Sequence, residues 1–437
     1  MSRKNLKITL GLAALFFMAA APPTMADGGF PEQPILTDYL QWAVEHHPGL
    51  GSARARSEVS RQNVAEAGAL PDLKLAWGEM IVPVETRVGP QQRIFSVSQS
   101  LPWFGTLGEA ETAADFQALA AQSMFQADSL AVEHEVRKAW FELARLQQEL
   151  VLTEDHFNLS RQSEQVALRA YETGSARFRN VLQAQMESEN LANRLESLQA
   201  RLVPATVKLN TAAGLPAVTA QPTASLPMAF ADPIGSVDLQ EFLHSGNPNL
   251  ESLRRQEESQ RHLVEAARLS GRPGLTLGLD YIMTGSAVMP GVDDSGKDPV
   301  IARLAINVPL WSGKATARRL ASASRLQAVS YQRSRLSLDL DQQYESLLYQ
   351  VRDSGRSWQL YEESLLPRAK QILSATTSDY ETGRATFDEV IGARENLLGL
   401  ELARLRATAD QALALSNLEV LLGAPVESLL SSNGNEF

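Results

Sequence analysis

Two spacings of apolar residues follow each other along this chain and predict two kinds of element. The clearest helical seam steps by four and three residues in turn through Val132, Val136, Ala139, Leu143, Leu146 and Leu150, which is the pattern of a coiled coil. Around residues 275–281 and 304–308, apolar and polar residues alternate instead, which indicates strands with one apolar face. The chain is therefore expected to be mainly α-helical with a small β part.

The first half of the chain carries a less regular version of the two strands. Residues 73–77 would form the outgoing strand and residues 95–101 the returning one. The connections at 83–90 and 284–299 contain Gly, Pro and Asp and are expected to be exposed loops. Three aspartates of the second connection could hold a calcium ion, although a solvated loop is the simpler interpretation; they are Asp293, Asp294 and Asp298.

A short motif occurs twice, 209 residues apart. Tyr-Glu-Thr-Gly begins at Tyr171 and again at Tyr380, followed in both copies by an Ala and a Phe at the same spacing. From Glu109 to Thr173 the chain has 65 residues without Gly or Pro, which is about 100 Å of helix. A Gly after such a run takes the left-handed conformation that stops a helix. Gly174 and Gly383 are therefore expected at hairpin tips, and a Gly tolerated inside one helix is the weaker alternative.

The duplication extends over whole halves of the chain. Pro48 aligns with Pro248, and a Gly with a nearby Pro closes each half at 214–216 and 423–425. Thr37-Asp38 is expected to cap the first helix, which has its counterpart near Asp238, and Pro367 is expected to kink or interrupt the long helix of the second half. The expected boundaries are a lead-in at 27–35, repeats at 36–216 and 237–430, a linker at 217–236 and a tail at 431–437.

The amino terminus has the features of a secretory signal peptide at residues 1–26. Arg3, Lys4 and Lys7 precede an apolar stretch from Ile8 to Ala21, which is too short for the alternative of an uncleaved membrane anchor. Its removal takes away three positive charges, so the formal net charge of −11 becomes −14, which argues against a nucleic-acid partner. The chain has no cysteine, so packing alone must stabilise an exported protein.

Four amphipathic strands place a constraint on any membrane-embedded form. No segment after the signal is apolar enough for a transmembrane helix, so strands would have to span the membrane, and single-chain barrels begin at eight strands. Three copies would supply twelve strands, continued by the hairpins as a second tube of about 100 Å. Aromatic residues near the strand ends suit the level of lipid headgroups, although buried corners are an equal alternative; they are Trp77, Trp103, Tyr281 and Trp311.

The signal peptide, the duplicated helix–strand–strand–helix halves, the Leu101-Pro102-Trp103-Phe104-Gly105 junction and the paired tips resemble the TolC-type outer-membrane efflux proteins of Gram-negative bacteria. The resemblance covers about Leu36 to Leu430. It implies a homotrimer with a 12-stranded outer-membrane β-barrel continued by a long periplasmic α-helical barrel. It also implies an exit duct that passively conducts substrates delivered by a periplasmic adaptor protein and, through it, an inner-membrane pump.

In that family the hairpin tips contact the adaptor and usually carry Val-Gly-Leu or Val-Gly-Thr. The matching residues here keep the Gly and replace the apolar residue by Thr; they are Thr173, Gly174, Ser175, Thr382, Gly383 and Arg384. Arg384 occurs in only one copy, so the tips would be inequivalent toward the adaptor unless this is simply a solvated charge. The family also closes its periplasmic end with acidic residues near the tips, for which the candidates are Asp379, Glu381, Asp388 and Glu389.

No catalytic, cofactor or metal-binding pattern is present, so a protein that is not an enzyme is expected. The six histidines have no Cys partners and no His-Glu-x-x-His spacing, and there is no Gly-rich phosphate loop. The junction motif resembles the subgroup that serves metal-cation pumps, and metal ions and organic compounds stay equal candidates for the cargo. Two other classes stay open. They are a periplasmic adaptor, which normally has one hairpin and a lipoyl-like domain, and a structural coiled-coil protein, which would not need the strands.

Overall fold

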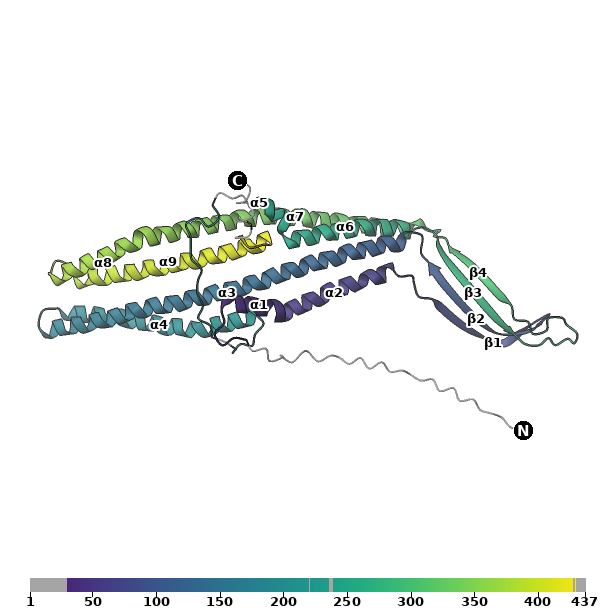
Figure 1. The fold of residues 1–437 in the computed structure, drawn as a ribbon, viewed down its shortest axis with the longest axis horizontal. Coiled ribbons are helices and arrows are strands. Elements are labelled where there is room, and N and C mark those ends of the chain that lie inside the picture. Colours follow the sequence, from purple (N-terminus) through teal and green to yellow (C-terminus); the bar gives the residue numbers. More distant parts are fainter. Residues whose placement is uncertain (1–29, 220, 236–238, 427–428, 430–437) are drawn as a thin grey trace, which may run out of the picture.

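The computed structural model describes residues 30–219, 221–235, 239–426 and 429. The expected signal peptide at 1–26, the expected helix start near Asp238 and the tail at 431–437 lie outside the described residues. The protein is drawn out along one axis, with a sheet at one end and two helical hairpin tips at the other (Figure 1). Within the described part of the chain, no helix combines the length and the apolar character needed to cross a membrane.

Two repeats follow each other with the same order of elements. The first repeat consists of α1 (Leu36–His46), α2 (Pro48–Gly68), β1 (Lys74–Thr86), β2 (Gly89–Leu101), α3 (Thr106–Glu172) and α4 (Phe178–Ala212). The second consists of α5 (Gln240–Gly246), α6 (Pro248–Leu269), β3 (Gly274–Thr284), β4 (Val300–Asn307), α7 (Ser312–Gln359), the π-helical segment η1 (Leu360–Leu365), α8 (Leu366–Glu381) and α9 (Phe387–Leu422). The predicted duplication and the mainly α fold are confirmed.

The strands of both repeats form one antiparallel sheet in the order β1-β2-β3-β4. The registers align Trp77, Phe95, Tyr281 and Val300 in one row across all four strands, and these apolar side chains share one face. The opposite face carries mainly small and polar residues, such as Ser98, together with Ile94, Ile282 and Ile301. The alternation predicted most clearly for β3 and β4 is therefore present on all four strands in the part of the sheet near the helices, and it is less regular beyond Glu79.

The prediction of an exposed loop at 83–90 is wrong. β1 continues to Thr86 and β2 starts at Gly89, so only a tight turn joins them. Pro83 lies inside β1, where the pairing register shifts between Glu79 and Val84. Proline lacks the N–H donor of the strand ladder and is tolerated on edge strands and at irregularities, and β1 offers both. The longer connection between β3 and β4 is a loop, as expected.

The predicted coiled-coil seam lies in a hydrophobic core, and a second core holds the long helix of the other repeat. The seam residues of α3 from Val136 to Leu146 are at most 1 % exposed and pack with Tyr39 of α1 and Leu209 of α4. The second core joins Leu340 and Val351 of α7 to the C-terminal half of α9. Each long helix is thus held by the returning helix of its own hairpin and by a short helix of its own repeat.

The start of α1 differs in detail from the prediction. The N-cap is Ile35, and Thr37 lies inside the helix. Asp38 occupies the third helical position, where its carboxylate accepts a hydrogen bond of 2.8 Å from the Ile35 backbone N–H. The predicted cap at Thr37-Asp38 is therefore wrong in position, although Asp38 does satisfy an open donor at the helix start. A helix break precedes each of the two aligned prolines, since α2 begins at Pro48 and α6 begins at Pro248.

The long helix of the second repeat is interrupted by η1, directly before Pro367, whereas α3 is continuous over 67 residues. The offset between equivalent residues is 208 at Leu143 and Val351, and it is 209 at Gly174 and Gly383. A π-helical turn accommodates one extra residue within a helix. The interruption predicted at Pro367 is confirmed, and it lies where the second repeat is one residue longer.

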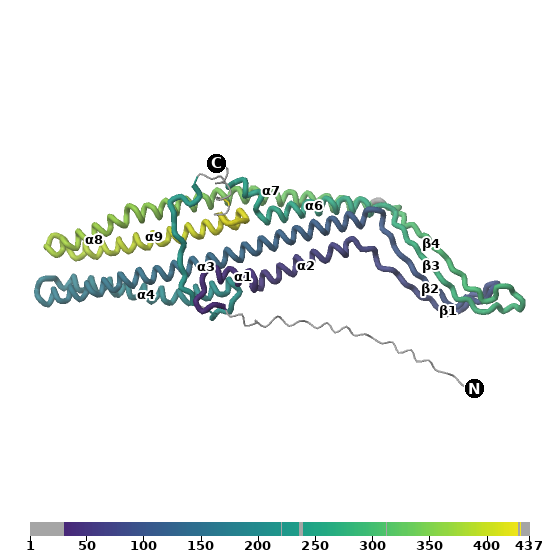
Figure 2. The backbone as a smooth tube through the Cα atoms, in the orientation of Figure 1, coloured from purple at the N-terminus to yellow at the C-terminus, as the bar shows by residue number. Residues whose placement is uncertain are grey.

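The linker between α4 and α5 crosses from one repeat to the other near the middle of the molecule (Figure 2). The side-chain amide of Gln411 in α9 accepts from the backbone N–H of Phe230 at 3.0 Å and donates to its carbonyl at 2.6 Å. Gln147 of α3 likewise accepts from the Ala224 N–H at 2.8 Å and donates to the Pro222 carbonyl at 2.9 Å. Two glutamines therefore fix the linker to both repeats.

Candidate functional site

The two hairpin tips have the same backbone geometry. Gly174 and Gly383 have φ values of +74° and +75°. The amides of Ser175 and Ala176 both donate to the Ala170 carbonyl, at 2.8 and 3.0 Å, and the equivalent amides of the second tip bond to the carbonyl of Asp379. This is a helix stop in the left-handed conformation, which only glycine adopts without steric cost. Both glycines lie at hairpin tips, as predicted.

The threonines before the two glycines turn their hydroxyl groups back onto their own helices. Thr173 donates to the carbonyls of Arg169 and Ala170, each at 3.1 Å. Thr382 makes the same bonds to Ser378 at 3.2 Å and Asp379 at 3.1 Å. Each hydroxyl is therefore satisfied within its helix end, so Thr can replace an apolar residue at this position.

The residue after each tip glycine distinguishes the two tips. Ser175 bonds through its hydroxyl to the Ala170 carbonyl at 2.9 Å. Arg384 instead forms an ion pair with Asp379, with guanidinium-to-carboxylate distances of 3.0 and 2.9 Å. The Arg384 side chain is still 70 % exposed, so the position directly after the tip glycine carries a surface cation in the second tip and a hydroxyl group in the first.

The four acidic residues predicted at the tips have separate roles and do not form one cluster. Asp379 pairs with Arg384, and Glu381 is exposed. Glu389 accepts from the Thr386 backbone N–H at 2.6 Å and caps α9. That N–H and, to a smaller extent, the Thr386 hydroxyl hold the pKa of Glu389 below its ordinary value. Asp388 is the member that reaches the other hairpin.

Asp388 of α9 accepts hydrogen bonds from Arg179 and Gln183 of α4. Arg179 and Asp388 are equivalent residues of the two repeats, 209 positions apart, and they carry opposite charges. Arg179 was not among the site residues predicted from the sequence. Comparing the charges of the two repeats position by position would have identified it.

Apolar packing lies beneath this polar contact. Ala167 of α3 and Val181 and Ala184 of α4 form a buried cluster with Phe387 of α9. Phe387 follows the second tip motif at the same distance at which Phe178 follows the first. The two hairpins are therefore joined at their tips by an apolar cluster and by the Asp388 hydrogen bonds.

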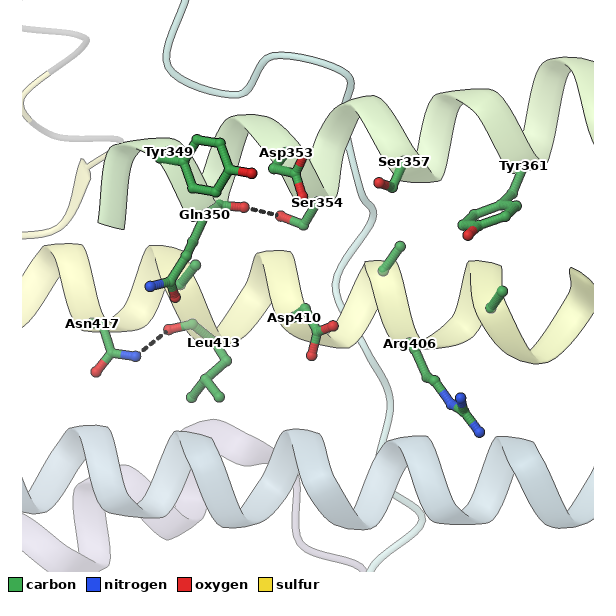
Figure 3. Close-up of a pocket in the computed structure, with 13 residues that line it drawn as sticks. Tyr349, Gln350, Asp353, Ser354, Ser357, Tyr361, Arg406, Asp410, Leu413 and Asn417 are labelled. Atoms are coloured by element: carbon green, nitrogen blue, oxygen red, sulfur yellow. Dashed lines mark hydrogen bonds between the residues drawn. The ribbon is translucent and has the colours of Figure 1, made fainter. Parts of the chain in front are cut away.

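A cavity of about 460 Å³ lies away from the tips, between α7, η1 and α9. Figure 3 shows Tyr349, Asp353 and Tyr361 on one side, and Arg406 and Asp410 on the other. Burial raises the pKa of the Asp410 carboxyl above its ordinary value. Apolar, polar and charged side chains line the cavity, and they do not converge as a catalytic set. All of them come from the helices of the second hairpin.

Two of the three aspartates of the β3–β4 loop, Asp294 and Asp298, have partners within the protein. Asp298 accepts from the Thr284 backbone N–H at 2.7 Å and from the Tyr281 hydroxyl. Asp294 lies 3.5 Å from the Lys297 ammonium. Among the described residues, no group of three histidine or carboxylate side chains has a spacing suited to a metal ion.

The four predicted interface aromatics lie at two levels of the sheet. Trp77 and Tyr281 lie in the row of the apolar face that contains Phe95, where they are 64 % and 40 % exposed. Trp103 and Trp311 lie where β2 and β4 give way to helices, and Trp311 is 84 % exposed. Gly105, with φ of +82°, allows the chain to turn from this junction into α3.

The chain matches the sequence pattern of outer membrane efflux proteins twice, at residues 39–215 and 240–424. It is 21 % identical over 404 residues to nodulation protein T of Rhizobium leguminosarum bv. trifolii, covering 90 % of this chain and 86 % of that protein.

Solved structures share the fold. The outer membrane protein VceC from Vibrio cholerae is 19 % identical, with a TM-score of 0.74 over 90 % of this chain and 96 % of that one. A membrane protein from Pseudomonas aeruginosa is 17 % identical, with a TM-score of 0.76 over 92 % of this chain and 95 % of that one.

Proposed function

Because the chain belongs to the outer membrane efflux protein family, we propose that three copies of it share one closed barrel and form the exit duct of a tripartite efflux system. The protein is an efflux channel of the outer membrane of a Gram-negative bacterium. A periplasmic adaptor and a structural coiled-coil protein are not favoured, because the family match covers both repeats. A channel needs no catalytic residues, which supports the expectation that the protein is not an enzyme.

The observation that carries the proposal is a four-stranded sheet with two open edges and an exposed apolar face. β1 and β4 are the edges of this sheet as far as the described residues go. Leu75 of β1 and Leu304 of β4 are 79 % and 63 % exposed on the apolar face. Unpaired strand edges are too costly in lipid. Pairing β4 of one copy with β1 of the next removes the edges, and three copies supply twelve strands.

The aromatic residues fit this arrangement. From the row of Phe95 to Trp103, two residues past the end of β2, there are eight residues, which span at most about 26 Å of extended chain and about 20 Å along the membrane normal at a strand tilt of about 40°. Outer-membrane strands present an apolar band of about 25 Å between two aromatic levels. We therefore assign Trp77 and Tyr281 to the outer interface of the membrane, and Trp103 and Trp311 to the periplasmic interface.

The oligomeric mass of the mature protein tests the shared barrel. Membranes are separated, the outer-membrane fraction is extracted in mild detergent, and the native mass is measured. The proposal predicts a trimer in the outer-membrane fraction. A monomer that stays in solution without detergent would refute it.

The tips are proposed as the surface that meets the periplasmic adaptor. Both tips are exposed turns at the end of the molecule farthest from the sheet (Figure 1). A photo-crosslinking residue at Ser175 or Arg384 is expected to capture the adaptor in cells, whereas the same residue at Tyr331, 66 % exposed on α7, is not. Capture at Tyr331 alone would place the adaptor elsewhere.

The acidic residues near the tips are proposed to form the periplasmic gate, with Asp388 tying the two hairpins together. Asp379, Glu381 and Glu389 would add negative potential at the constriction and favour cations. Replacing Asp379 by Ala should lower the cation preference of single channels in planar bilayers. Unchanged conductance and cation preference in this variant would remove Asp379 from the gate.

A further inference from the structure

The polar face of the sheet carries its own pattern, which the registers define. Lys74 pairs with Ser98, Ser98 pairs with Gly278, and Gly278 pairs with Arg303. Directly paired residues point to the same face of a sheet. A Cβ atom added at Gly278 would lie 3.6 Å from the Cβ atoms of both Ser98 and Arg303, which agrees with this assignment. One row across all four strands therefore begins and ends with a cation.

The middle of this row is a gap of small residues. Neighbouring strands are about 4.8 Å apart, so Lys74 and Arg303 are separated by roughly 14 Å. Between them lie only a hydroxymethyl group at Ser98 and a hydrogen atom at Gly278. Both cations therefore border a shallow polar surface that water and a solute can reach.

Arg303 is held in place by a buried carboxylate. Asp280 lies one row away on the same face and is 2 % exposed. Its carboxylate accepts from the Ser96 hydroxyl at 2.5 Å and from the Arg303 guanidinium. The Arg303 side chain is 60 % exposed, whereas that of Asp280 is 3 % exposed. The carboxylate is thus buried on this face beside the guanidinium, which stays exposed.

We infer that Lys74 and Arg303 form a cationic belt inside the membrane part of the duct, which attracts solutes bearing carboxylate, sulfonate or phosphate groups. This inference rests on the proposed function, since the polar face lines the lumen only if the strands close into a shared barrel. Three copies would place three Lys74 and three Arg303 side chains around the lumen, as two rings roughly 9 Å apart along the barrel axis at a strand tilt of about 40°. Rings of basic side chains favour anions in pores.

The belt contrasts with the acidic residues at the hairpin tips. At an ionic strength of 0.1 M the screening length is about 10 Å, far shorter than the helical hairpins that separate the two regions. Each region therefore sets its local potential independently. An overall ion preference would mix the two, so the test must report the potential at the belt itself.

The absence of cysteine allows such a local test. Single cysteines are introduced at Ser98 and at Gly278, and their reaction rates with an anionic sulfonate thiosulfonate and a cationic ammonium thiosulfonate are compared in outer-membrane preparations at low salt. The anionic reagent is expected to react faster at both sites. Adding Lys74→Gln should lower the anion-to-cation rate ratio at Ser98→Cys about sevenfold, because one nearby charge changes the local potential by roughly kT and the two reagents carry opposite unit charges.

The effect of Arg303 is measured in a background that leaves no buried charge unpaired. The combined change Asp280→Asn with Arg303→Gln leaves the net charge unchanged, so it should lower the rate ratio at Gly278→Cys less than Lys74→Gln lowers that at Ser98→Cys, and only because the removed cation is exposed and the removed anion is buried. Arg93→Gln is the matched control, because Arg93 pairs with Glu79 at 2.9 Å on the opposite, apolar face. It should leave both ratios unchanged.

Val97→Cys separates failure of the inference from failure of the proposed function. Val97 neighbours Ser98 in sequence but shares the apolar face with Leu75 and Leu279. If Val97→Cys reacts with the charged reagents and Ser98→Cys does not, the lumen assignment is wrong and the shared barrel fails. If only Ser98→Cys and Gly278→Cys react, the lumen assignment and the shared barrel are supported. If their rate ratios then do not change when Lys74 and Arg303 are replaced, the cationic belt is refuted.

Discussion

The two hairpin tips share a backbone and differ in charge. Both turn at a glycine with φ near +75° and close the same hydrogen bonds. Around this common turn the first repeat carries Arg177 and Arg179, whereas the second carries Thr386 and Asp388 at the equivalent positions. The turn is fixed by backbone geometry, while the surrounding side chains are free to diverge. The divergence allows equivalent residues to form a contact between the repeats.

The long helices differ in a second way. α3 runs without interruption, whereas its counterpart contains η1. The segment η1 keeps the seam and the tip of the second repeat in register despite one extra residue. The same architecture thus tolerates one extra residue in the second repeat, because a π-helical turn accommodates it. The continuous helix α3 of the first repeat shows the fold without that residue.

The first prediction has the largest expected effect. One residue is deleted from each long helix in turn, to compare how α3 and the helix containing η1 respond to a change in length. Removing Glu154 from α3 rotates all following residues by about 100° and takes Ser160 and Ala167, each at most 2 % exposed, out of their packing. The expected cost is on the order of 5 kcal/mol or more, with loss of assembled protein.

Removing Glu363 from η1 should instead convert the π-helical turn to an α-helical one and cost about 1 kcal/mol. Thermal unfolding in detergent, followed by circular dichroism, measures both variants. Equal damage from the two deletions would mean that η1 does not accommodate an extra residue.

A second prediction concerns the linker, which meets Gln147 in one repeat and Gly355 in the other. A Cβ atom at Gly355 would lie 2.4 Å from the Ala231 carbonyl oxygen and 2.7 Å from that of Phe230. Gly355→Ala is therefore expected to destabilise the protein by about 2 kcal/mol. Gly392→Ala is the control, since its Cβ would meet no atom within 4 Å, and it should stabilise the helix by about 0.5–1 kcal/mol. Thermal unfolding of the two variants should shift in opposite directions.

A third prediction exchanges the charges of the tips. Arg179→Asp places two carboxylates opposite each other, and the double variant with Asp388→Arg restores the pair in reverse. The pair is exposed, at 70 % and 49 %, so its effect on the free energy of unfolding should be about 0.5 kcal/mol. The single variant should raise the open probability of channels in bilayers, and the double variant should return it. An unrestored double variant would exclude the pair as a tie between hairpins.

The prediction with the smallest expected effect compares how the starts of α9 and α4 respond to a fall in pH. The pKa of Glu389 is lowered in the folded protein by the Thr386 backbone N–H. The stabilising contribution is therefore present above the ordinary pKa of a glutamate and is lost as the pH falls through the lowered value. The first repeat has Arg177 and Asn180 at the equivalent positions. Hydrogen exchange at the start of α9 should increase in acid relative to the start of α4, after correction for intrinsic rates. Equal changes would contradict a role for this cap.

Much of the fold follows from local rules that act on particular residues. Gly174 and Gly383 stop helices because few other residues adopt their φ values, and the α3 seam from Val132 to Leu150 is readable because its period is regular. Pro83 misled the prediction, because whether a proline can lie in a strand depends on the strand being an edge. That is a property of the assembled sheet.

The candidate site was predictable in part for the same reason. The tips were located by their repeated motif, and Asp388 was selected for its charge. The contact between Arg179 and Asp388 joins residues 209 positions apart, so its existence depends on how two hairpins pack. The row of Lys74, Ser98, Gly278 and Arg303 likewise depends on strand registers, which alternation alone does not define.

The most direct test of the account is a disulfide between the open edges of the sheet. A cysteine at Leu304 of β4 is combined in turn with one at Leu73, Leu75 or Trp77 beside or within β1, and outer membranes are oxidised. Within one chain, β1 and β4 are separated by two strands, roughly 14 Å, which is too far for a disulfide. A shared barrel predicts covalently closed trimers on a non-reducing gel for at least one pair. Monomers for all three pairs, or an open ladder of higher oligomers, would contradict it.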